Sequence, residues 1–209
     1  MLSKLIRRIA NKIRHIKYKK IVNKGQNNII QMPEWRTQIC IHGNNNKVII
    51  DKTAQFTGSI YIGAPDSYTD NCVVIIGKNT QSNGTDIRLM EDNSTVEIGS
   101  DCLFSTNVYI ACSDTHSILD FDDNLLNTGK FVKIGNHIWI CQDARIGKNV
   151  TIPDNCIIGM GSIVTKEFTE PNCIIAGNPA KVVKKNIKWN KLRPKQYLAL
   201  TQKEVVKNG

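Results

Sequence analysis

The amino-acid sequence predicts an all-β fold, a parallel β-helix built from short strands and tight turns. The main observation is a period of six residues, which neither the helical period of 3.6 nor simple strand alternation produces. Composition agrees with it, because aromatic residues make up only 6% of the chain and 14 glycines suit a fold with many turns. No run of 18 apolar residues occurs, which argues against a transmembrane helix.

The repeat is clearest from residue 134 onward, where six consecutive hexads each begin with an aliphatic residue. These hexads start at Ile134, Ile140, Ile146, Ile152, Ile158 and Val164. An earlier block in the same phase starts at Ile98, and before it the pattern loosens into irregular coils. We interpret each hexad as one strand and one turn, with its first residue pointing inward and three hexads forming a triangular coil.

Seven cysteines are scattered along the chain, an odd number without a C-x-x-C pair. This spacing argues against a zinc site or a disulfide framework and favours a reducing compartment. Cys102 and Cys156 occupy the fifth place of their hexads, where a small side chain fits a crowded corner. We therefore expect them to be packing residues rather than reactive thiols.

The two ends of the chain differ from its body. Residues 1–23 hold eight Lys or Arg and no acid, with aliphatic residues at helical spacing, and predict a short basic amphipathic helix. Residues 184–209 form a basic tail with one acid, whereas the body, residues 24–183, carries a net charge of −5. An acidic body argues against a nucleic-acid partner. The N-terminal helix either lies on an anionic membrane surface or packs on the body or on a neighbouring subunit.

The second half of the chain resembles the hexapeptide-repeat acyltransferases. The resemblance rests on Ile-Gly-Asn-His-Ile-Trp-Ile from Ile134, Ile-Gly-Met-Gly-Ser-Ile-Val-Thr-Lys from Ile158, and Ile-Ala-Gly-Asn-Pro-Ala-Lys-Val-Val from Ile175. The segment 168–189 is most similar to the branch that O-acetylates bacterial surface polysaccharides, including polysialic acid capsules. The resemblance implies a left-handed β-helix with a C-terminal helical tail, a homotrimer with sites between subunits, and acetyl-CoA as acetyl donor.

The repeat is interrupted between Ile110 and Val132, and we expect residues 111–131 to form a catalytic loop. His116 lies in this loop, and imidazole is suited to remove the proton of an attacking sugar hydroxyl. Asp114, two residues earlier, is expected either to orient the His116 ring or to cap a turn. In relatives the histidine of this loop acts as the base and attack is direct, without an acyl-enzyme.

The resemblance also implies which residues contact the donor. The tryptophan that matches Trp139 lies beside the catalytic histidine of the neighbouring subunit and near the thioester, whereas His137 is expected to be structural. In galactoside acetyltransferases the coenzyme contacts fall on the positions of Gln142, Met160, Thr165, Lys166, Lys181 and Lys184. This chain departs from that group at Cys141, where glycine is usual, at Met160, and in its lysines, which replace arginines. Pro179 ends the repeat, and a helix can start there.

These observations predict an acetyl-CoA-dependent O-acetyltransferase that acts on a bacterial surface glycan: capsule, polysialic acid or lipopolysaccharide. We expect it in the bacterial cytoplasm, or peripheral on the inner face of the cytoplasmic membrane. The alternatives are an acetyltransferase of a small acceptor, such as a nucleotide amino sugar or serine, and a non-enzymatic β-helix scaffold. A metal site is not expected, because His116 and His137 are 21 residues apart and no close histidine pair occurs.

Overall fold

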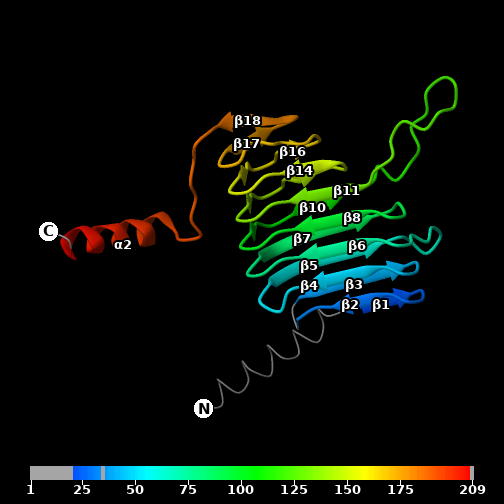
Figure 1. Cartoon of the computed structure of the whole chain (residues 1–209), viewed down its shortest axis with the longest axis horizontal. Coiled ribbons are helices and arrows are strands. Elements are labelled where there is room, and N and C mark those ends of the chain that lie inside the picture. Colours follow the sequence, from blue (N-terminus) through cyan, green and yellow to red (C-terminus); the bar gives the residue numbers. More distant parts are fainter. Residues whose placement is uncertain (1–20, 34–35, 208–209) are drawn as a thin grey trace, which may run out of the picture.

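The computed structural model describes residues 21–33 and 36–207, which form a β-helix followed by a helical tail (Figure 1). Strands stack in parallel from coil to coil. Face 1 is a six-stranded sheet of β2 (Ile29–Gln31), β4 (Lys47–Ile50), β6 (Val73–Ile76), β8 (Thr95–Ile98), β11 (Phe131–Ile134) and β14 (Val150–Ile152). The predicted fold class, a left-handed parallel β-helix, is confirmed.

The other two faces belong to one twelve-stranded sheet, because β5 (Gln55–Ile62) and β7 (Gln81–Leu89) continue through a corner. Face 2 consists of 55–57, 81–83, β9 (Leu103–Phe104), β12 (Trp139–Ile140), β15 (Ile157–Ile158) and β17 (Ile174–Gly177). Face 3 consists of β1 (Ile21–Lys24), β3 (Thr37–His42), 58–62, 85–89, β10 (Val108–Ala111), β13 (Arg145–Ile146) and β16 (Ile163–Val164). At the corner of β5, Gly58 has φ of 153°, and a Cβ there would lie 2.0 Å from the Thr85 carbonyl oxygen, so the position requires glycine.

The hexads place their side chains as the repeat predicts. The first residue of every hexad from Ile134 to Val164 is buried, and these side chains form one continuous aliphatic core. Fifth-place residues are buried too, including Cys102 and Cys156, as predicted for packing residues. Burial raises the pKa of the Cys102 thiol to about 11, so this thiol stays protonated at neutral pH.

Asparagine is frequent because the corners demand a left-handed backbone. Fifteen described residues other than glycine have positive φ, and ten of them are Asn. Asn tolerates this conformation better than most residues. Their side chains also bond between coils: Asn149 Oδ1 accepts the Lys130 N–H at 2.9 Å, and Asn79 Nδ2 donates to Asp101 Oδ1 at 3.2 Å. The corners are thus stabilised by both backbone preference and hydrogen bonds.

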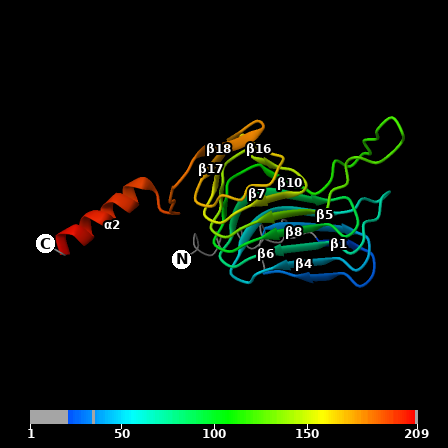
Figure 2. The ribbon, with the colours of Figure 1, turned by 45° about the horizontal axis from the view of Figure 1, so that its top comes forward.

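A long loop leaves the β-helix between Ala111 at the end of β10 and Phe131 at the start of β11. It projects well beyond the coils (Figures 1 and 2). Within it, residues 119 and 125 form an isolated antiparallel bridge, and Asp120 closes a turn by bonding to Asn124. The predicted catalytic loop is therefore a separate structure attached to a rigid scaffold.

The C-terminal tail contains a helix, as predicted, but the helix begins only at Pro194. No helix starts at Pro179, because β17 and β18 (Ala180–Lys184) form an antiparallel hairpin across the last coil. The chain then runs back along the corner of the coils: Ile187 N donates to the Asn172 carbonyl at 2.9 Å, and Lys191 Nζ donates to the Asn79 carbonyl at 3.2 Å. Helix α2 (Pro194–Lys207) stands away from the body (Figure 1).

The N-terminal prediction is tested only at its end. Residues 1–20 of the expected basic helix lie outside the described residues. Residues 21–23 are not helical, because they belong to β1, which pairs in parallel with β3. Among the described residues, no helix is long and apolar enough to cross a membrane.

Candidate active site

His116 lies on the projecting loop and lines a hollow of about 160 Å³. The hollow is lined by Glu91, Ser113, Thr115, His116, Ser117, Leu125, Asn127 and Thr128. The residue before His116 is strained, because the β-branched Thr115 has φ of 71°. Its N–H donates to Ser113 Oγ at 2.9 Å, which helps to hold this turn. The His116 ring is exposed and makes no hydrogen bond within the described residues.

Asn127 fixes the backbone of His116. Its Nδ2 donates to the His116 carbonyl at 2.8 Å and to Asp114 Oδ2 at 2.9 Å, while its Oδ1 accepts the Ile118 N–H at 2.8 Å. One side chain therefore ties the residues on both sides of the histidine together. Sequence reasoning missed Asn127, which stands eleven residues after His116 in a stretch without repeat character.

Asp114 does not bond to the His116 ring. Its carboxylate forms an ion pair with Lys148 and accepts the Asn127 amide, and these two contacts hold the pKa of Asp114 below its ordinary value. Lys148 comes from the coil beneath the loop and also donates to the Asn127 carbonyl. Asp114 is therefore linked to His116 only through Asn127. The expectation that it orients the imidazole directly has no contact to support it.

Trp139 is the first residue of β12 on face 2, where it pairs with Leu103 and Ile157 of the adjacent coils. Its side chain is half-buried at the surface of the coil. Trp139 does not line the hollow that holds His116. Within one chain the two predicted catalytic side chains therefore belong to separate parts of the surface.

A second tryptophan, Trp189, lies beside Trp139 with the ring centroids 6.0 Å apart. It stacks on the His137 ring at 4.1 Å with an interplanar angle of 7°, and its Nε1–H donates to the His137 carbonyl at 2.8 Å. His137 Nδ1 in turn lies 3.0 Å from Asn155 Oδ1. His137 is therefore a structural residue, as expected. Trp189 was missed because nothing in the tail sequence places it against the β-helix.

The residues expected to contact the donor fall into two groups. Gln142 and Met160 lie on consecutive turns at the corner between faces 2 and 3, where Gly161 N donates to the Gln142 carbonyl at 2.9 Å and Met160 is 72% exposed. Lys166 and Lys181 meet near the C-terminal end, in a hollow of about 390 Å³. Thr165 and Lys184 lie beside this hollow in sequence but do not line it.

The hollow shared by Lys166 and Lys181 suits an anion, although carboxylates line it as well. Lys166 and Lys181 contribute two ammonium groups, and Lys166 Nζ lies 5.7 Å from the Phe168 ring centroid. Glu167 and Glu170 also line it, and Glu170 is bound by Lys185 at 2.8 Å. In the part of the chain that the structure describes, no group of three or more His, Cys, Asp or Glu is arranged to hold a metal ion.

Comparison with known proteins gives consistent relatives. The chain is 34% identical to the polysialic acid O-acetyltransferase of Neisseria meningitidis over 174 residues, covering 74% of this chain and 80% of that protein. It is also 34% identical over 143 residues to the polysialic acid O-acetyltransferase of Escherichia coli O1:K1, covering 68% of this chain and 44% of that protein. The galactoside O-acetyltransferase of Escherichia coli K12 is 35% identical, with 56% of each chain covered. The chain thus spans about half the length of these last two relatives.

Solved structures agree with this result. The crystal structure of the polySia-specific acetyltransferase NeuO matches with a TM-score of 0.71 and 26% identity, over 88% of this chain and 99% of that chain. No protein-family model matches the chain.

Proposed function

Because the chain belongs to the hexapeptide-repeat acetyltransferase family, we propose that it transfers an acetyl group from acetyl-CoA to a hydroxyl of a bacterial surface glycan. The observation that carries this proposal is the placement of His116, which a bonded network holds at a hollow on a loop of the β-helix. The relatives named for polysialic acid and galactoside acetylation support a sugar hydroxyl as the acceptor.

His116 acts as the general base. As the sugar oxygen attacks, its proton passes to the imidazole, which needs a free ring nitrogen directed into the hollow. The exposed ring, without a hydrogen bond to the described residues, leaves a nitrogen available for this role. Bound acetyl-CoA supplies a thioester carbonyl, whose carbon forms the new C–O bond as its C–S bond breaks. The proton that His116 took from the sugar then passes to the departing sulfur. The acetyl group goes directly from the thioester to the sugar, so no covalent enzyme intermediate is needed.

Asp114 acts in this scheme as a positioning residue. Its ion pair with Lys148 anchors the loop to the next coil, and Asn127 transmits this restraint to the His116 backbone. A catalytic base must be held near a productive geometry, since small displacements are costly in rate. The network provides such restraint for a residue on a projecting loop.

The proposed donor site consists of two groups of residues, one at the corner between faces 2 and 3 and one at the hollow near the C-terminal end. We propose that Trp139, Gln142 and Met160 line the path of the acyl arm along the corner between faces 2 and 3. Lys166, Lys181 and Lys184 are proposed to bind the phosphates, because ammonium groups attract them as point charges, and Thr165 to donate its hydroxyl to them. The hollow shared by Lys166 and Lys181 fits an anionic group of the coenzyme.

The site is proposed to form between subunits of a homotrimer. His116 and Trp139 lie apart within one chain, so a site that uses both requires a neighbouring copy. The histidine of one subunit would face the tryptophan of the next. The exposed loop is available for this contact.

The test of the proposed base is His116→Ala with His42→Ala as a matched control from the N-terminal coils. Loss of the base should lower transfer of labelled acetyl to a glycan acceptor by about 10²–10⁴-fold, while the affinity for acetyl-CoA stays unchanged in calorimetry. The control should retain wild-type turnover. Near-normal turnover of His116→Ala would contradict the assignment, and absence of coenzyme binding by the wild type would favour a scaffold.

We further propose that residues 1–20, with their excess of basic side chains, hold the enzyme at the inner face of the cytoplasmic membrane in the bacterial cytoplasm. Each Lys or Arg near an anionic surface contributes about 1 kcal/mol, in a salt-sensitive manner. Deletion of residues 1–20 should abolish sedimentation with anionic vesicles at low salt and leave acetylation of a dissolved acceptor intact. Equal vesicle binding by both proteins would refute this role.

A further inference from the structure

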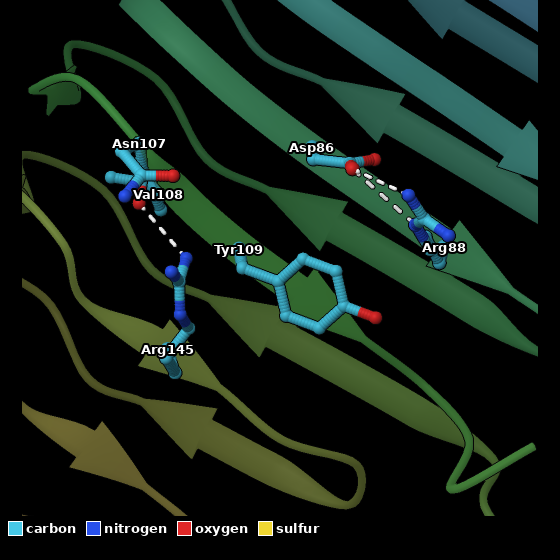
Figure 3. Close-up of a pocket in the computed structure, with 6 residues that line it drawn as sticks. All are labelled: Asp86, Arg88, Asn107, Val108, Tyr109 and Arg145. Carbon is cyan, nitrogen blue, oxygen red and sulfur yellow. Dashed lines mark hydrogen bonds and ion pairs between the residues drawn. The ribbon is translucent and has the colours of Figure 1, made fainter.

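A hollow of about 450 Å³ lies on face 3. It shares no lining residue with the hollow of His116 or with the hollow of Lys166 and Lys181. It is lined by Asp86, Arg88, Asn107, Val108, Tyr109 and Arg145, which come from β7, β10, β13 and the turn before β10 (Figure 3). Their polar side chains point outward because the alternate residues of each strand, Ile87, Ile110 and Ile146, are buried in the core. The hollow is therefore a surface feature built on rigid strands.

Two guanidinium groups flank one aromatic ring in this hollow. Tyr109 lies between Arg88 and Arg145 (Figure 3), with its ring centroid 5.8 Å from the Arg88 guanidinium carbon and 5.7 Å from that of Arg145. The Tyr61 ring lies 5.1 Å from Arg88 on the adjacent coil. Cation–π contacts of this kind hold both side chains in place without using up their N–H donors.

The charges of the hollow are unbalanced. Arg88 binds Asp86 Oδ2 through Nη2 at 3.0 Å and Nε at 3.3 Å, and this contact raises the pKa of Arg88. Arg145 has no carboxylate partner among the described residues and bonds only to the Asn107 carbonyl, at 3.0 Å. Since a guanidinium has five N–H donors, Arg145 keeps most of them for a ligand. The hollow thus has one positive charge in excess.

The hollow also contains an acceptor without a donor. Asp86 Oδ1 is buried and has no hydrogen-bond partner among the described residues. Because this oxygen is closed to solvent, a ligand in the hollow meets Asp86 mainly through Oδ2, which Arg88 already binds. A ligand that matches the accessible groups therefore combines an anionic group for Arg145 with an apolar surface for the tyrosine rings. An acidic sugar has both.

The hollow is connected to the His116 loop through β7. Cys112, at the start of the loop, donates its N–H to the Arg88 carbonyl at 3.0 Å. Glu91, three residues after Arg88, lines the hollow of His116 and accepts the Gly129 N–H at 2.8 Å. Three residues span at most about 10 Å. A glycan chain could occupy both hollows at once.

We propose that the hollow on face 3 binds one acidic sugar unit of the acceptor, with its carboxylate on Arg145 and Arg88 and its ring against Tyr109. This inference rests on the proposed function and adds a specificity determinant for acidic glycans. Packing against a second copy of the chain is the competing role. We favour the glycan because the guanidinium of Arg145, which has no carboxylate partner among the described residues, and the Tyr109 ring beside it match a carboxylate and the apolar face of a sugar ring.

The test compares Arg145→Gln and Arg88→Gln with a matched control, Lys133→Gln, which removes the same charge from face 1. Each protein is assayed on an oligomer of sialic acid and on the same oligomer with its carboxyl groups converted to methyl esters. Binding of both oligomers is also measured by calorimetry without acetyl-CoA. Size-exclusion chromatography with light scattering records the oligomeric state of every variant.

We expect each arginine variant to raise the KM and the Kd for the acidic oligomer about tenfold. Both values for the ester, and the KM for acetyl-CoA, should stay unchanged, and the lysine control should match the wild type. An unchanged Kd for the acidic oligomer, or an equal increase of Kd for the acidic oligomer and for its ester, would overturn the proposed subsite. Acetylation of the ester would still support the proposed function in that case. A change of oligomeric state would assign the hollow to a subunit contact, and failure of the wild type to bind the acidic oligomer would also overturn the proposal.

Discussion

At the residue scale, the restraint on His116 comes from side chains that do not touch its ring. Asn127 bonds to the His116 carbonyl, and the charged pair of Asp114 and Lys148 anchors Asn127 from the coil below. The ion pair depresses the pKa of Asp114, so its contribution is present above the ordinary pKa of an aspartate, about 3.9, and is lost as pH falls through the lower folded value. The restraint therefore persists through the neutral range.

This arrangement predicts how Asp114→Asn will behave. Loss of the ion pair should lower kcat about tenfold through misplacement of the base. The acidic limb of the pH–rate profile should keep its position, because the carboxylate does not contact the imidazole. Asp120→Asn, which changes a carboxylate bound to Asn124 in the same loop, should leave kcat near wild type. A shift of the limb to lower pH in Asp114→Asn would instead identify Asp114 as a direct partner of the ring.

At the scale of elements, the corners of the coils depend on residues that accept positive φ. Asn172 is a clear example, since it has φ of 57° and, within the described ranges, takes part only in backbone hydrogen bonds, to Asp154 and Ile187. Asn172→Ala should lower the free energy of unfolding by about 1 kcal/mol, because alanine keeps the Cβ that disfavours positive φ and lacks the polar group with which asparagine offsets this cost. Asn172→Gly should cost less, since glycine adopts this backbone readily.

Urea unfolding of the two variants measures the difference. Ser100→Ala is a suitable control, because Ser100 lies on the same corner three coils away and contributes backbone groups to the contacts with Asn136 and His137. Equal destabilisation by Ala and Gly at position 172 would show that the asparagine side chain, rather than the backbone conformation, stabilises the corner.

The elements show what the sequence can and cannot predict. The hexads from Ile134 to Val164 predict the strands and the inward-pointing residues correctly, because a buried aliphatic side chain recurs at a fixed place in each coil. Pro179 permits a helix start, but none begins there, because the antiparallel pairing of β17 and β18 decides the local structure and the helix of the tail begins only at Pro194. Trp189 and Asn127 were missed for a similar reason. Their partners, His137 and His116, are 52 and 11 residues away, and no local pattern reports such contacts.

At the scale of the whole molecule, the projecting loop carries apolar side chains that the described chain does not cover. Five large ones are at least 50% exposed: Ile118, Leu119, Phe121, Leu125 and Leu126. Apolar side chains gathered on one projecting segment are typical of an interaction surface. The loop that bears His116 is therefore suited to pack against a neighbouring subunit, in agreement with the proposed shared site.

The last prediction tests that shared site by subunit mixing. His116→Ala and Trp139→Ala proteins should each be inactive when assembled alone, because each lacks one half of every site. If the histidine of one subunit works with the tryptophan of the next, mixed trimers contain some sites with both residues intact. Unfolding and refolding equal amounts of the two variants together should therefore restore about one quarter of the wild-type activity, because about three quarters of randomly assembled trimers are mixed and each mixed trimer has one intact site of three. Differently tagged subunits and two-step purification verify the mixed trimers. Verified mixtures that remain inactive would show that His116 and Trp139 do not act together across a subunit boundary.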